Sequence, residues 1–145
     1  MIDFTPDPCH VEIAERTRTF IRDTILPYES DARWTAAGPT DDLRADLTGL
    51  ARAAGLLSPH VTVDFGGHGL SHLGRALVFE EAGRSMLGPI ALNIAAPDEG
   101  NAHLLASIAT DEQKERWLAP LARAEIRTAF AMTEPPQVLV PTRAC

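Results

Sequence analysis

Cysteine and contiguous positive charge are both scarce in this chain of 145 residues. The 2 cysteines, Cys9 and Cys145, lie near opposite ends, so a disulfide framework of the secreted kind is not expected and both thiols should be unpaired. The 13 Lys and Arg residues face 20 Asp and Glu residues, which leaves a net charge of -7. Without a clustered basic face, neither nucleic acid nor an anionic membrane is expected as the main partner.

Long apolar runs are absent as well. No stretch approaches the roughly 18 consecutive apolar residues of a membrane-spanning helix. The first twenty residues contain Pro6, Pro8 and several charged side chains, where a secretory signal would need an apolar run. These absences predict a cytoplasmic protein without a membrane span. Apolar residues make up 45% of the chain, a proportion typical of a globular domain that buries a core without staples.

Helix start signals followed by apolar residues at helical spacing recur along residues 1–124. Asp7, Thr40, Ser71 and Thr110 each precede such a pattern, and Thr110 begins a capping box. This part of the chain is therefore predicted to be an all-α domain of about six helices. Its predicted core consists of Leu43, Leu47, Leu50, Leu73, Leu77, Leu104, Leu105, Trp117, Leu118 and Leu121.

The pattern changes after residue 124. Two sets of side chains alternate, which is the two-residue period of a β-strand: Ile126, Thr128, Phe130 and Met132 on one face, and Arg127, Ala129, Ala131 and Thr133 on the other. No other convincing strand precedes this one, and it therefore lacks a partner. We expect one orphan strand and its turn over residues 125–136, at the start of a β-domain, followed by a tail over 137–145.

Three local patterns suggest chemistry only weakly. His68 and His72 have the spacing of two ligands on one helix face, but no third ligand is near and we predict no metal. Glu80 and Glu81 are adjacent and point in different directions on a helix, so we expect one of them in solvent and the other paired inside. Glu80 is expected to pair with Arg84, four residues on, on the outward face. The glycines of residues 66–69 lack a phosphate-loop spacing and indicate a turn.

Several segments resemble one family in their order and spacing. Residues 109–118 (ATDEQKERWL), residues 120–121 (PL) and residues 130–135 (FAMTEP) are similar to acyl-CoA dehydrogenases. Residues 55–57, 66–71 and 78–84 resemble the N-terminal helical domain of that family, and residues 89–101 resemble a subset of it. The resemblance covers residues 8 to about 135.

The resemblance implies an enzyme that binds FAD between helical and β-domains and removes hydrogens from Cα and Cβ of an acyl-CoA thioester. Electrons would pass to an electron-transfer flavoprotein, and the full-length protein would be homo-oligomeric. Phe130, Met132, Thr133 and Glu134 are the implied flavin-binding residues, with the Thr133 hydroxyl on the ring. The catalytic carboxylate of the family would lie downstream, so none is expected in this chain.

The tail departs from the family. A Gly-Ala-Gly-Ser-Asp loop should follow Pro135-Pro136, yet residues 137–145 read QVLVPTRAC. One choice of synonymous codons for this tail encodes that loop in another reading frame, so we hypothesise a frameshift at this point. The chain would then be the inactive N-terminal portion of an acyl-CoA dehydrogenase. The alternative is a non-catalytic helical module that pairs with a full-length homologue, but three consecutive apolar residues, 138–140, favour the first interpretation.

Overall fold

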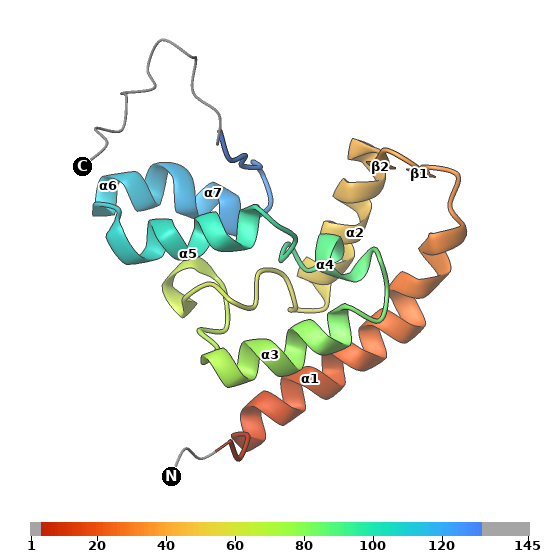
Figure 1. Ribbon diagram of the computed structural model, residues 1–145, viewed down its shortest axis with the longest axis horizontal. Helices are drawn as coiled ribbons and strands as arrows, with labels where there is room; N and C mark the ends of the chain where they lie inside the picture. The colour runs from red at the N-terminus through yellow and green to blue at the C-terminus, as the bar shows by residue number, and fades with distance from the viewer. Residues whose placement is uncertain (1–3, 132–145) are drawn as a thin grey trace, which may run out of the picture.

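Six helices make up most of the fold over residues 4–131, which the computed structural model describes (Figure 1). α1 (Pro8–Phe20) continues through a π-helical turn (Ile21–Ile25) and a 3₁₀ turn (Leu26–Ser30). The next four are α2 (Asp41–Ala53), α3 (His72–Ala82), α4 (Gly88–Ala91) and α5 (Asp98–Ile108). The sixth joins α6 (Asp111–Gln113), π-helical Lys114–Leu118 and α7 (Ala119–Ala122). The all-α prediction is confirmed.

Short extended and turn segments connect these helices. β1 (Trp34–Thr35) and β2 (Gly38–Pro39) form a short antiparallel pair between the first helix and α2. A 3₁₀ turn, Val63–Phe65, lies between α2 and α3. No helix within residues 4–131 is both long and apolar enough to cross a membrane.

The predicted helix starts are confirmed by hydrogen bonds. The Asp7 carboxylate accepts from the Cys9 amide at 2.9 Å, and the Thr40 and Ser71 hydroxyl oxygens accept from amides three residues on. At α6, Thr110 and Gln113 each accept a bond from the other's backbone amide, which completes the predicted capping box. Local sequence therefore sets where these helices begin.

Two apolar cores stabilise the domain. The larger one lies among α1 to α4, where α1 and α3 run side by side (Figure 1). The smaller one joins α5 to the α6–α7 helix through Val61, Ala102, Leu118, Leu121 and Ala122. The largest fully buried apolar side chains of the larger core are Ile21, Ile25, Leu43, Leu47, Leu56, Val78, Leu87 and Leu92.

A buried polar network connects the two cores. The Asn93 amide donates to the Ser58 hydroxyl oxygen at 2.9 Å and to the Leu121 carbonyl at 2.8 Å, and Ser58 donates to the Ala122 carbonyl at 2.7 Å. Asn93 and Ser58 both have positive φ, of 57° and 49°. Since Asn tolerates that region better than most residues, its presence here suits both the backbone and the hydrogen bonds.

The predicted core is only partly correct. Leu43, Leu47, Leu118 and Leu121 are buried, and four further members are half-buried: Leu50, Leu73, Leu77 and Leu105. By contrast, Leu104 is 50% exposed and Trp117 is 46% exposed. Both lie on helix faces turned away from the two cores. They were predicted to be buried because helical spacing identifies an apolar face but not what covers it.

The predicted strand has no ladder within the described residues. Residues 127–131 are neither helical nor paired with another strand, and the only sheet within residues 4–131 is the β1–β2 pair. A strand needs a neighbour for its backbone groups, and residues 4–131 supply none here. The rest of the predicted strand, its turn and the 137–145 tail lie outside the described residues.

The acidic pair in α3 divides its roles as expected, with one correction. Glu80 is exposed, whereas Glu81 is buried and binds Arg18 and Arg84. Arg84 therefore pairs with Glu81, three residues back, and not with Glu80, because the buried carboxylate needs a cationic donor.

Candidate functional site

Residues 126–131 leave the last helix and are held against the start of α5 by polar contacts. One carboxylate oxygen of Asp98 accepts hydrogen bonds from both the amide and the hydroxyl of Thr128, each at 2.7 Å. The Asn101 amide donates to the same hydroxyl oxygen at 2.8 Å. Three hydrogen bonds thus fix Thr128 on α5, and Asp98 itself is buried.

The start of α5 favours this arrangement. Asp98 and Asn101 are three residues apart, so their side chains lie on the same face of the helix. A carboxylate in the first turn also interacts favourably with the positive end of the helix dipole. Neither residue was predicted as an anchor from the sequence, although the spacing of Asp98 and Asn101 at the start of a helix was an available signal.

An apolar groove of about 600 Å³ lies beside the anchored segment. Leu104 of α5 and Trp117 of the π-helical turn, two of the exposed apolar side chains of the fold, line it together with residues 126–129. The Arg116 guanidinium lies 4.8 Å from the centre of the Trp117 ring, an arrangement that holds the indole in place. The full lining is Asn101, Leu104, Leu105, Trp117, Ile126, Arg127, Thr128 and Ala129.

A second cavity, of about 470 Å³, is also lined by residues 127–129 of this segment. Its other lining residues are Arg44 from α2, residues 95–97 before α5 and Asp98 at the start of α5. The Nε atom of Arg44 is buried and makes no hydrogen bond with the described residues, and burial, then the nearby Arg127, lowers the pKa of Arg44. Two guanidiniums near one cavity make it suitable for an anionic group.

Comparison with known proteins identifies the domain. The sequence profile of the acyl-CoA dehydrogenase N-terminal domain matches residues 7–125. The chain belongs to the acyl-CoA dehydrogenase family. FadE2 of Mycobacterium tuberculosis, named as an acyl-CoA dehydrogenase, is 34% identical over 141 residues, which cover 92% of this chain and 34% of FadE2.

Other relatives in the family give the same result. Human acyl-CoA dehydrogenase family member 11 is 32% identical over 139 residues, which cover 86% of this chain and 16% of that protein. A solved structure from Mycobacterium abscessus, of a chain assigned to the acyl-CoA dehydrogenases, superposes with a TM-score of 0.74 at 34% identity. The superposed part covers 91% of this chain and 36% of the M. abscessus chain. The chain thus spans about a third or less of these relatives' length.

Of the flavin-binding residues implied by the family, one is described. Phe130 is 62% exposed, directly after the segment that lines the groove. Met132, Thr133 and Glu134 lie outside the described residues. Whether these four residues gather around one ligand therefore stays a prediction.

The other sequence patterns have structural roles in the dehydrogenase domain. The His68 Nε2 atom donates to the Gly55 carbonyl at 2.8 Å, and His72 is exposed in the first turn of α3. A Cβ at Gly67 would lie 2.0 Å from the Val61 carbonyl oxygen, so the tight turn requires glycine there. Among residues 4–131, no three His, Cys, Asp or Glu side chains are placed to share a metal ion.

Proposed function

We propose that this chain forms the N-terminal helical portion of an FAD-dependent acyl-CoA dehydrogenase. Membership of the family supports the reaction class, and the anchored segment beside the apolar groove is the structural observation that carries the proposal. The activity is the α,β-dehydrogenation of an acyl-CoA thioester. When bound, FAD supplies the hydride-accepting chemistry.

The residues of the anchored segment fit a flavin. Its isoalloxazine ring is flat and largely apolar, and Phe130 offers an exposed aromatic side chain beside an apolar groove. Phe130, Met132, Thr133 and Glu134 would hold the ring, with the Thr133 hydroxyl as a polar contact. Single contacts of this kind set orientation, whereas tight binding needs many of them.

The helical residues would act by positioning and by excluding water. Asp98 and Asn101 fix Thr128 and so fix the chain direction that leads to Phe130. Leu104 and Trp117 give the groove an apolar wall, which favours the apolar part of a ligand over water.

The remaining family properties are proposals for the whole protein. They are an acyl-CoA substrate, electron transfer to an electron-transfer flavoprotein and homo-oligomeric assembly. We propose that the 145-residue polypeptide alone is inactive, because none of its residues is assigned as the catalytic carboxylate and one segment supplies few flavin contacts. The cytoplasmic location stays a prediction.

A chimera tests the function. Residues 7–131 would replace the matching segment of the M. tuberculosis relative, and we expect the purified chimera to carry flavin that bleaches when an acyl-CoA is added. An Asp98→Ala version should lose most of this bleaching, because Thr128 is then no longer fixed on α5. A Glu99→Gln version, changed at the adjacent position, is the matched control.

A folded but colourless chimera would count against the proposal. In that case the alternative function, a non-catalytic module, predicts that the isolated 145-residue chain forms a stable complex with the full-length relative. Size-exclusion chromatography of the mixture separates the two outcomes.

A further inference from the structure

His60 lies in the connector between α2 and α3 and is buried to 3% exposure. Neither of its ring nitrogens has a hydrogen-bond partner among the described residues. One side of the ring packs edge-on against Phe79, with 6.4 Å between ring centroids. Buried polar groups without partners are rare and costly, so two on one side chain point to a missing partner.

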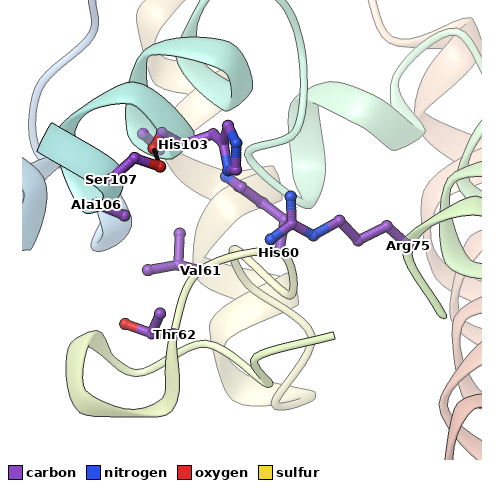
Figure 2. A pocket seen from close by; sticks show the side chains of 8 residues that line it. His60, Val61, Thr62, Arg75, His103, Ala106 and Ser107 are labelled. Atoms are coloured by element: carbon purple, nitrogen blue, oxygen red, sulfur yellow. Dashed lines mark hydrogen bonds between the residues drawn. The ribbon is translucent and has the colours of Figure 1, made fainter. Parts of the chain in front are cut away.

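A cavity of about 220 Å³ provides the space for that partner. His60 lines it together with Arg75 of α3 and with His103 and Ser107 of α5. Figure 2 shows the Arg75 side chain extending from α3 toward the rings of His60 and His103. The cavity is far larger than one water needs and smaller than most drug-sized pockets, so it suits a small ligand.

The charges around the cavity favour an anion. The Nε atom of Arg75 donates to the Leu70 carbonyl at 3.1 Å, while its Nη1 atom makes only a long ion pair with Glu99, at 4.0 Å and without a hydrogen bond. Burial, then Arg75, then His103, lowers the pKa of His60 to about 4. The neutral ring presents one N–H donor, and Arg75 and His103 can add further donors.

We propose that this cavity binds a small oxyanion, with His60 and Arg75 as its main ligands and His103 at the rim. The N–H of His60 would donate to one oxygen of the anion, and the guanidinium of Arg75 would donate to another. A phosphate group and a small carboxylate share this chemistry. The anion satisfies a buried donor and offsets the positive charge of Arg75.

This site is separate from the groove of the proposed dehydrogenase function. Ala102, His103 and Ala106 of α5 face the cavity, whereas Asn101, Leu104 and Leu105 face the groove. The two sets lie on different faces of one helix. Variants in the cavity therefore leave the groove unchanged, and failure of one proposal does not decide the other.

Nuclear magnetic resonance of the ¹⁵N-labelled 145-residue chain tests the site. Sodium phosphate and sodium acetate would be titrated separately at constant ionic strength maintained with sodium chloride. We expect a saturable shift of the His60 ring signals and a higher pKa of His60 at saturation. Arg75→Gln should weaken the affinity about tenfold or more, because a charge-assisted bond is lost. Arg116→Gln, an exposed arginine outside the cavity, should not.

The two anions distinguish the source of the oxyanion. A response to phosphate alone assigns a phosphate group, and a response to acetate alone or to both assigns a carboxylate-sized oxyanion site. His103→Gln is the second variant, because His103 is exposed and its replacement leaves the fold intact even if Arg75→Gln does not fold. Absence of a saturable shift with either anion would overturn the proposal. So would a shift that Arg75→Gln and His103→Gln leave unchanged.

Discussion

Arg18 of α1 and Glu81 of α3 are joined by two parallel hydrogen bonds, at 2.8 and 3.1 Å, although 63 positions separate them in sequence. The Glu81 side chain is 6% exposed, and Arg84 donates to the same carboxylate. Two guanidiniums thus compensate one buried negative charge. This contact holds together the two helices that form one side of the larger core.

Glu81→Gln is expected to destabilise the domain by about 2 kcal/mol, because the charge-assisted bonds to Arg18 and Arg84 are lost while the side-chain shape is kept. The free energy of unfolding in urea measures the effect. Glu80→Gln on the same helix is the control and should stay within about 0.5 kcal/mol of the parent, because Glu80 is exposed. Equal effects of the two changes would contradict a stabilising role of the buried Glu81 carboxylate and its two arginine partners.

The contribution of the Glu81 carboxylate to the free energy of unfolding should be lost in acid. The hydrogen bonds from Arg18 lower the pKa of the Glu81 carboxyl from 4.5 to about 2. The unfolded chain therefore takes up the proton at a higher pH than the folded chain, so stability is lost as the pH falls. The difference in unfolding free energy between the parent and Glu81→Gln should be full above about pH 4.5 and shrink toward pH 2. A difference that is independent of pH would show that the ionised carboxylate is not responsible.

Asp98→Ala should release the segment that follows the last helix. The Thr128 amide loses its carboxylate acceptor at 2.7 Å, and its hydrogen exchange should accelerate about tenfold or more. Amides in the middle of α2 and α3 should keep their rates. Glu99→Gln, at the neighbouring position, should leave the Thr128 exchange rate at the parental value, and a similar acceleration there would argue against the anchor.

Two glycine replacements should act in opposite directions. A Cβ at Gly49, in the middle of α2, would meet nothing within 4 Å, so Gly49→Ala should stabilise the domain by about 0.5–1 kcal/mol. A Cβ at Gly88 would lie 2.0 Å from the Ala82 carbonyl oxygen, so Gly88→Ala should destabilise the domain. Thermal unfolding compares both variants, and a loss of stability in Gly49→Ala would refute the first expectation.

Sequence patterns predicted the features that depend on neighbours along the chain. The capping box at Thr110 and Gln113 forms as expected because both partners lie within one turn. The apolar spacing also located Leu43 and Leu47 in the larger core. Such interactions need no knowledge of the tertiary structure.

Features that depend on distant partners could not be predicted in the same way. Leu104 was placed in the core by its spacing, yet it is half-exposed because no described segment covers its face of α5. The role of Asp98 as an anchor depends on Thr128, 30 positions later. His60 gave no signal either, because its cavity is formed by residues of two helices that come later in the chain.

The network of Asn93 and Ser58 has a consequence for motion within the domain. Hydrogen bonds depend on angle, whereas apolar contacts between two cores would tolerate sliding. If α5–α7 rotated against α1–α4, the Asn93 amide would lose the Leu121 carbonyl and the Ser58 hydroxyl would lose the Ala122 carbonyl, at about 1–3 kcal/mol for each buried donor left unpaired. The two cores should therefore move as a single body. The orientation of the groove in space is then set by helices that do not line it.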